Sequence, residues 1–219
     1  ISDIERVGLN LNYDNTSIDT GSTPASQILA FTQSEGTKFE VLKAQFIWSK
    51  ITLNRGLFPT AGQSQSFTLQ AAVPGSSLTY SKVSYRHKYF KPILDGRFVL
   101  GFRGEIGALE AYGDTEVAPF FEHYYSGGIS SVRGFKQNTL GPRAIPSQYY
   151  IDNEGNPILG QDGNPIMNPY SYYRDDRSIG GAYLIEGGFD FIFKLPFIED
   201  QRSMRSSFFV DVGNVFSKD

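Results

Sequence analysis

Seven stretches of the chain alternate apolar and polar residues with a period of two, and this pattern constrains the fold more than any other feature. In the first stretch, Val7, Leu9 and Leu11 alternate with Gly8 and Asn10. Successive side chains of a β-strand point to opposite faces of a sheet, so each stretch predicts a strand with one apolar and one polar face. The predicted strands lie at about residues 7–13, 42–51, 67–73, 80–91, 98–112, 183–193 and 207–213.

The two faces of these strands differ in the way expected for a membrane barrel. One is rich in Phe and Tyr, as expected toward lipid; the other is small and polar, at positions such as Gly8, Thr68 and Ser84, as expected for a wet lumen. Short connections also alternate with long ones, which is the layout of outer-membrane barrels. The predicted fold class is therefore all-β, with antiparallel amphipathic strands of a transmembrane β-barrel. A soluble β-sandwich or soluble barrel also alternates, and periodicity alone leaves that alternative open.

The composition fits this class and excludes others. The 219 residues carry a formal net charge of -3, without the basic surface that nucleic-acid binding needs. No apolar run approaches the roughly 20 residues of a spanning helix, whereas a spanning strand needs only about 9 to 11. The chain has no cysteine, which excludes disulfides, thiolate zinc sites and cysteine nucleophiles. The length predicts one domain.

Two smaller elements are expected within the long connections. Pro24 suits the first position of a short helix that extends to about Gln33, with Thr23 as its cap and Gly36 beyond its end. Much later, residues 152–158 are echoed by residues 162–166, which predicts a polar hairpin-like excursion.

The longest connection, at about residues 113–178, carries the motif Val132-Arg133-Gly134-Phe135. Arginine can hold a bidentate grip on carboxylates, and the adjacent glycine allows a backbone turn that other residues resist. Asp190 and Asp211 fall on the polar phase of the last two predicted strands. Together these features predict a loop anchored inside the barrel. In the alternative interpretation, the two aspartates are only solvated lumen residues.

An ordered set of segments resembles the outer-membrane assembly factors, the barrel subunits of the bacterial β-barrel assembly machinery. A four-residue match would be weak evidence, but the whole set is typical of this family. The resemblance covers residues about 40–217. Its segments are Thr52–Gly62, Val73–Ser76, Phe120–Gly128, Ser131–Phe135, Asn138–Arg143, Gly180–Gly181, Leu195–Phe197 and Ser207–Phe216.

The resemblance implies a role for each residue of the motif. In the family the loop folds back into the lumen, and its arginine meets acidic residues of the following two strands. The matching residues here are Arg133 in the loop and Asp190 and Asp211 on the strands. Arg133 then fixes the loop, and Gly134 and Phe135, which follow Val132, set its turn and its packing.

The resemblance also implies that the chain is part of a larger barrel. The family has periplasmic substrate-binding domains before a sixteen-strand barrel, and about seven strands cannot close that barrel. We expect residues 1–219 to be a partial barrel domain that lacks the periplasmic domains, the terminal strands and the lateral seam between them. Such a fragment is expected to be inactive alone and to self-associate through its open sheet edges.

The function implied by the resemblance is the folding and insertion of β-barrel proteins in the outer membrane of Gram-negative bacteria. The expected partners are nascent outer-membrane proteins, accessory assembly lipoproteins and outer-membrane lipid. The alternatives are a two-partner secretion transporter, which exports one polypeptide, and a passive porin, which needs no anchored loop. A soluble binding sandwich is a third alternative.

No catalytic or metal-binding arrangement is evident, so we expect no enzyme, no metal and no cofactor. His87 and His123 are the only histidines, and neither belongs to a paired spacing typical of zinc sites. His87 is expected to be interfacial or packed, and His123 to pack within the loop. Ser130-Ser131 has no ordered His and Asp partners for nucleophilic catalysis, and residues 152–162 lack the calcium-loop pattern.

Overall fold

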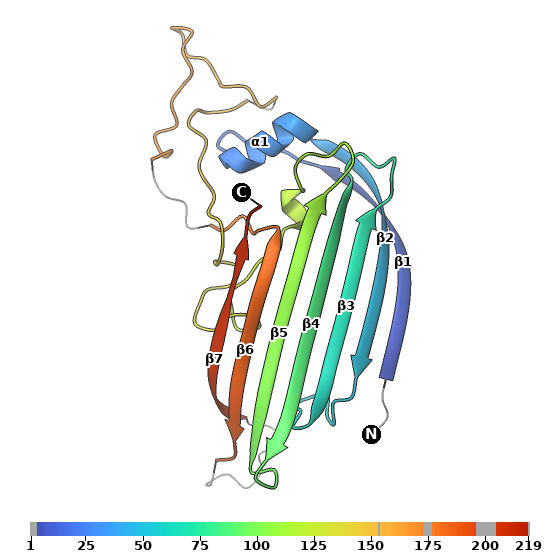
Figure 1. Ribbon diagram of the computed structural model, residues 1–219. Coiled ribbons are helices and arrows are strands. Elements are labelled where there is room, and N and C mark those ends of the chain that lie inside the picture. The colour runs from blue at the N-terminus through green and yellow to red at the C-terminus, as the bar shows by residue number, and fades with distance from the viewer. Residues whose placement is uncertain (1–3, 153, 173–176, 196–204, 219) are drawn as a thin grey trace.

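Seven strands form one antiparallel sheet in the order of the sequence (Figure 1). The computed structural model describes residues 4–152, 154–172, 177–195 and 205–218, so Pro196 and Phe197 of the resemblance lie outside the described residues. The sheet is open, and the predicted fold of antiparallel amphipathic strands in a partial barrel is confirmed. The strands are β1 (Ile4–Ser17), β2 (Lys38–Ile51), β3 (Gly62–Ala72), β4 (Tyr80–Ile93), β5 (Phe98–Ala111), β6 (Tyr183–Phe193) and β7 (Ser206–Phe216).

The strand register keeps the apolar residues of neighbouring strands on one face, here called the outer face. Phe102 lies opposite Phe189 across β5 and β6, with their ring centroids 5.0 Å apart. Aromatic pairs of this kind stabilise a sheet beyond the burial of their area. Val210 and Ile185 are exposed on the same face, as expected for residues that contact lipid. The opposite, inner face carries most of the charged residues of β4 to β7, among them Arg86, Arg103, Glu186 and Asp211.

The connections at the two ends of the sheet differ in length (Figure 1). At one end, residues 94–97 make a tight turn between β4 and β5 in which Leu94, Asp95 and Gly96 all have positive φ. At the other end lie the connection that contains α1 (Ser26–Glu35) and the longest connection, residues 112–182. No helix among the described residues is long and apolar enough to cross a bilayer.

The predicted helix exists, but its predicted start is wrong. Ala25, rather than Thr23, is the N-cap, and no side chain caps the helix. The cause is tertiary, because Ala25 forms a β-bridge with Pro146 and the Ser26 amide donates to the Ile145 carbonyl oxygen at 2.6 Å. These contacts occupy the chain where the cap was expected. Gly36 ends the helix with φ 96°, as predicted.

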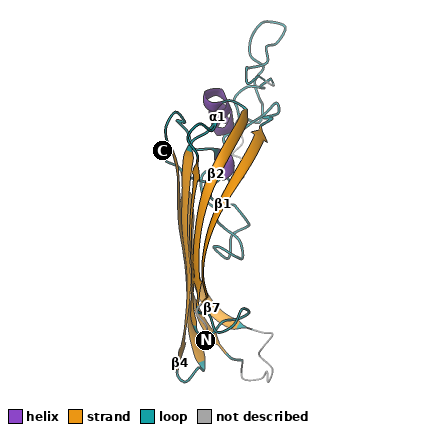
Figure 2. Cartoon of the chain, turned by 90° about the vertical axis from the view of Figure 1, so that its right-hand side faces the viewer, coloured by secondary structure: helices purple, strands orange, loops and turns teal. Residues whose placement is uncertain are grey.

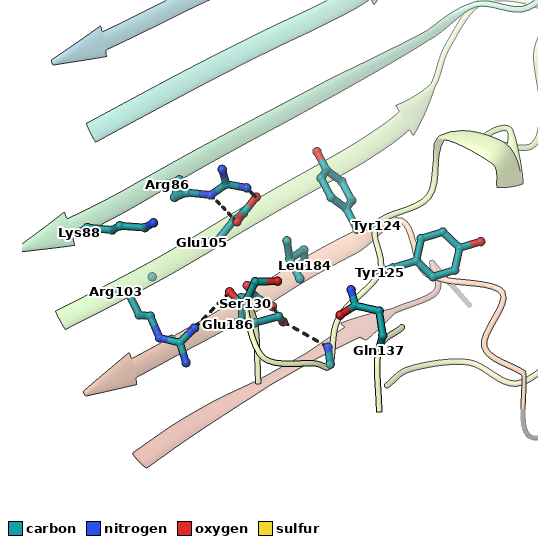
Figure 3. Close-up of a pocket in the computed structure, with 14 residues that line it drawn as sticks. Arg86, Lys88, Arg103, Glu105, Tyr124, Tyr125, Ser130, Gln137, Leu184 and Glu186 are labelled. Carbon is teal, nitrogen blue, oxygen red and sulfur yellow. Dashed lines mark hydrogen bonds and ion pairs between the residues drawn. The ribbon is translucent and has the colours of Figure 1, made fainter. Parts of the chain in front are cut away.

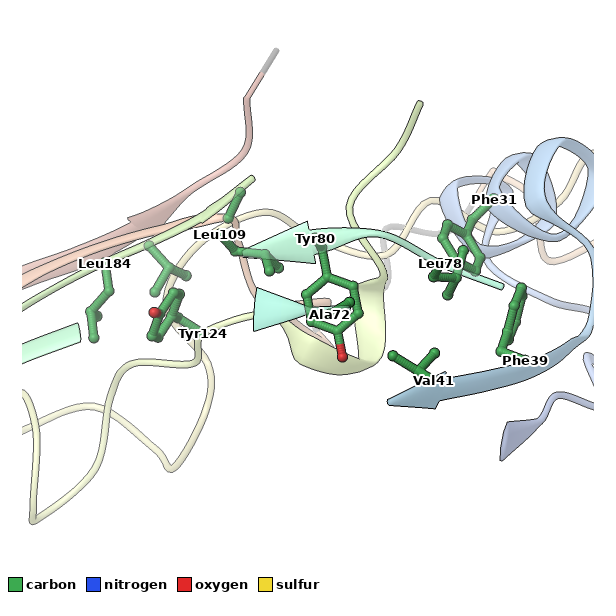
Figure 4. Packing of buried hydrophobic residues seen from close by; sticks show 11 residues of the cluster. Phe31, Phe39, Val41, Ala72, Leu78, Tyr80, Leu109, Tyr124 and Leu184 are labelled. Atoms are coloured by element: carbon green, nitrogen blue, oxygen red, sulfur yellow. The ribbon is translucent and has the colours of Figure 1, made fainter. Parts of the chain in front are cut away.

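One part of the longest connection lies beside the sheet, and another part projects beyond the long-loop end of the strands (Figure 2). Near its far end, bridges join Tyr149 to Met167 and Leu159 to Pro165, which confirms the predicted hairpin-like excursion. Buried apolar side chains gather where this connection and α1 meet the long-loop end of the sheet (Figure 4). Phe31 of α1 packs on Phe39 of β2, with 5.7 Å between their ring centroids. Burial of a side chain of this size contributes about 1.5–3 kcal/mol. The cluster includes Tyr124 and Ala182 of the longest connection and therefore fixes these parts of it against the sheet.

Candidate functional site: a loop bound to the inner face

Arg133 lies on the inner face with both aspartates that the sequence singled out. Its Nε and backbone N–H donate to Asp211 Oδ2 at 2.7 and 3.0 Å, and one terminal nitrogen donates to Asp211 Oδ1 at 2.8 Å. Its other terminal nitrogen donates to Asp190 Oδ1 at 2.8 Å. The Asp211 side chain is only 2% exposed, so water cannot replace these donors easily. A bidentate, charge-assisted contact of this kind is among the stronger polar contacts in proteins.

A cation–π contact with an aromatic side chain also stabilises the position of Arg133. The guanidinium carbon lies 3.7 Å from the centroid of the Phe209 ring, which faces inward from β7. A cation over an aromatic face contributes about 0.5–2 kcal/mol, depending on how much water remains. Phe209 was not identified from the sequence, although its odd number gives it the same strand phase as Asp211.

The other three residues of the motif differ in how far they are buried. Val132 is buried, at 3% exposed, and its carbonyl oxygen accepts from the Gly128 amide at 3.2 Å. Gly134 has φ 93° with open space around it, so its conformation rather than crowding favours glycine. Phe135 is 54% exposed, and its role in packing stays a prediction.

A second arginine, Arg103 of β5, also reaches Asp211. Arg103 lies opposite Gly188, and Gly188 lies opposite Asp211, so the arginine must cross β6. Its terminal nitrogen forms an ion pair with Asp211 Oδ1 at 2.6 Å, and its other terminal nitrogen donates to the Ser130 carbonyl oxygen of the loop at 3.2 Å. The crossing depends on the missing side chain, because a Cβ on Gly188 would lie 2.5 Å from Asp211 Oδ1. The alternation of β5 gives the face on which Arg103 lies, but it does not predict this contact.

Nearer the top of the sheet, Glu122 binds the start of the loop to two strands. It lies in the short 3-10 helix η1 (Phe120–Glu122) and pairs with Lys43 of β2 at 2.7 Å and Lys82 of β4 at 3.2 Å. Burial raises the pKa of the Glu122 carboxyl, but the Lys43 hydrogen bond and the charges of Lys82 and Lys43 lower it more. The net pKa is below its usual value, so Glu122 is a carboxylate at neutral pH. The sequence showed no sign of this contact, since it depends on the path of the loop.

The next two residues of the loop are packed. His123 Nδ1 lies 2.9 Å from the Ile179 carbonyl oxygen, and burial lowers the pKa of His123. The Tyr124 hydroxyl donates to the Val83 carbonyl oxygen at 2.7 Å, and burial raises the pKa of Tyr124 to about 12, which keeps this donor protonated. The chain accommodates the Tyr124 ring at Gly107, where a Cβ would lie 2.6 Å from the ring.

A polar pocket of about 410 Å³ remains between the loop and strands β4 to β6 (Figure 3). Arg86 and Glu105 face each other in it through a two-point contact, with Nε to Oε2 at 2.7 Å and a terminal nitrogen to Oε1 at 2.9 Å. Among the described residues, no group of three or more His, Asp or Glu side chains could hold a metal ion. The polar groups of this region bind the loop and the strands to one another.

Antiparallel amphipathic strands with an arginine-bearing loop on their inner face define an outer-membrane β-barrel. The Omp85 superfamily domain matches residues 1–219, and the chain belongs to that superfamily. It is therefore part of a barrel in the bacterial outer membrane, which confirms the predicted localisation.

The relatives are assembly factors. The outer membrane protein assembly factor BamA of Neisseria meningitidis serogroup B is 28% identical over 224 residues, which cover 99% of this chain and 25% of that protein. BamA from Haemophilus ducreyi, in a crystal structure that lacks POTRA domains 1–3, superposes with a TM-score of 0.77 at 25% identity. That match covers 98% of this chain and 39% of the solved chain. The chain thus spans well under half the length of the relatives it matches.

The resemblance found in the sequence is confirmed, but its predicted extent is too narrow. It was expected over residues about 40–217, whereas the superfamily match begins at residue 1. The first strand and the loop that follows it consist mainly of alternation and turn residues, which carry few distinctive motifs.

Proposed function

We propose that this chain is the part of an outer-membrane insertase that carries the loop and its wall, and that the full protein folds and inserts β-barrel proteins. The observation that carries the proposal is the Arg133 contact with Asp190 and Asp211, in a chain related to BamA over 99% of its length. The partners proposed for the full protein are nascent outer-membrane proteins, accessory assembly lipoproteins and the surrounding lipid.

In this proposal the protein works by binding and not by covalent catalysis. A client strand gains main-chain hydrogen bonds at a sheet edge, as in other cases of strand addition. A membrane-spanning segment whose apolar band is shorter than the bilayer is thick causes local thinning of the bilayer, and such thinning would assist insertion of a client. Arg133 contributes by fixing the loop to β6 and β7, which holds these two strands in one position relative to the loop. In a partly wet lumen the cluster stabilises the bound loop by about 1–3 kcal/mol.

Charge reversal at Arg133 tests the proposal in the full-length parent protein. Arg133→Glu brings a third carboxylate against Asp190 and Asp211. We expect cells depleted of the native copy to lose several outer-membrane proteins when they depend on this variant. Adding Asp190→Arg is expected to restore part of the loss. Asp190 is the better compensating position, because an arginine at residue 211 would meet Arg103.

Lys136→Glu is the matched control. It reverses an exposed charge in the same loop, three residues after Arg133, and leaves the contacts of Arg133 with Asp190 and Asp211 in place. Normal levels of outer-membrane proteins with a folded Arg133→Glu barrel would refute the proposal. Loss of a single exported polypeptide would favour the two-partner transporter instead, and a changed solute conductance with normal assembly would favour the porin.

A further inference from the structure

Glu186 of β6 binds the loop through contacts that do not involve Arg133. Its Oε2 accepts a hydrogen bond from Ser126 Oγ at 2.8 Å and a second from Ser131 Oγ. The two hydroxyl oxygens lie 3.0 Å apart, and Ser131 Oγ also accepts from the Gly127 amide at 3.2 Å. One carboxylate oxygen thus holds both ends of the turn that precedes Val132.

This arrangement is separate from the arginine contacts. Ser126 is fully buried, so its hydroxyl depends on a protein partner. The Ser131 amide donates to the Gly128 carbonyl oxygen at 3.1 Å, which closes the turn between the two serines. Arg133 is bound by Asp211 and Asp190, further along the loop. The Glu186 contacts therefore fix the loop to the wall at a place distinct from the Arg133 cluster.

The position of Glu186 in the sheet is unfavourable without the loop. Glu186 lies directly opposite Glu105 of β5 on the same face, and like charges directly opposite each other destabilise a sheet. Arg86 meets Glu105 on one side, and the two serines meet Glu186 on the other. On β7, Gly213 lies opposite Glu186 and leaves it space, because a Cβ there would lie 2.6 Å from Glu186 Cβ.

We infer that Glu186 is a positioning residue that clamps the Ser126–Ser131 turn and holds the loop on the wall independently of Arg133. The inference that Glu186 positions the turn rests on these contacts and does not depend on the proposed function. The consequence for the assembly of outer-membrane proteins rests on the proposed function.

Cysteine labelling in the full-length parent tests this clamp. Val132→Cys is a suitable reporter, because Val132 is buried beside the turn and residues 1–219 contain no cysteine. We expect Glu186→Ala, and separately the Ser126→Ala/Ser131→Ala pair, to raise the rate of maleimide labelling about tenfold, as for the loss of one or two hydrogen bonds. Glu186→Gln keeps an acceptor oxygen and is expected to rescue most of the protection.

Glu105→Gln is the matched control, since it neutralises the opposite carboxylate and leaves both serine contacts of Glu186 in place. Its labelling is expected to be no faster than in the parent. Unchanged labelling in Glu186→Ala and in the serine pair would overturn the inference, and so would an equal rise in Glu105→Gln. Levels of outer-membrane proteins are measured separately. Faster labelling with normal assembly would uphold the clamp and count against the proposed function only.

Discussion

Replacing Gly188 with alanine is expected to loosen the loop, although alanine is normally more favourable than glycine within a strand. A Cβ at this position would lie 2.5 Å from Asp211 Oδ1 and 2.7 Å from Arg103 Nε. Ordinary contact begins at 3.4 Å, so the Asp211 carboxylate must retreat by roughly 1 Å in a closely packed site. The flexible end of Arg103 can move away, but Asp211 is held by three Arg133 donors.

The expected magnitude follows from the contacts of Asp211. Alanine in place of glycine stabilises a strand by about 0.5–1 kcal/mol whether or not the loop is bound, so this term does not change the binding of the loop. Losing a hydrogen bond to a charged group costs about 1.5–3 kcal/mol, and distorting it costs about 1–2 kcal/mol. The detached population of the loop is therefore expected to rise about 5- to 30-fold.

Hydrogen–deuterium exchange measures this population directly, because the Arg133 amide donates to Asp211. Peptides that contain Arg133 are expected to exchange faster in Gly188→Ala. Gly187→Ala is the control: its nearest neighbour would be the Arg103 carbonyl oxygen at 3.4 Å, an ordinary contact. Exchange in Gly188→Ala that is no faster than in Gly187→Ala would refute the reasoning.

Three further predictions concern the start of the loop. Because the pKa of His123 is lowered, its contribution to stability is complete above pH 6.5 and decreases as the pH falls from 6.5 toward the folded-state pKa. Exchange protection near His123, expressed relative to the intrinsic exchange rate at each pH, should therefore fall in that window, and His123→Gln should remove this dependence. Glu122→Gln leaves Lys43 and Lys82 without their shared carboxylate, and limited proteolysis should then cut the loop faster than in Glu110→Gln. Tyr124→Phe removes the hydroxyl that donates to the Val83 carbonyl oxygen, and chemical denaturation should show a loss of about 1 kcal/mol.

The strands could be predicted from the sequence because their alternation is a local property. Alternate residues of β6 or β7 point to opposite faces of the sheet, so Asp190 and Asp211 could be assigned to the inner face before any contact was known. Their meeting with Arg133 needed the family resemblance, since parity does not show which part of a long loop reaches them. The structure brings the three together.

The other contacts of the loop could not be predicted, because they depend on its path. Glu122, Ser126 and Ser131 have no periodic pattern, and their partners lie 40 or more residues away on strands. Glycine offered the one usable signal: Gly188 and Gly213 interrupt the inner face beside charged residues, which indicates a close approach by another group. The start of α1 was misjudged for a similar reason, since a distant bridge at Ala25 overrode local capping.

The route of the loop also has a mechanical consequence. Glu122 is bonded to β2 and β4, and Arg133 is bonded to β6 and β7. The intervening residues therefore act as a diagonal brace across the curved sheet (Figure 1). A brace fixed at both ends on the inner face resists flattening of the arc, because flattening increases the distance between those ends, and it resists sliding of the strands in the direction that increases this distance. The stiffness of this wall is consequently a property of the loop as much as of the strand ladder, and releasing either end would let the sheet bend before a single interstrand hydrogen bond breaks.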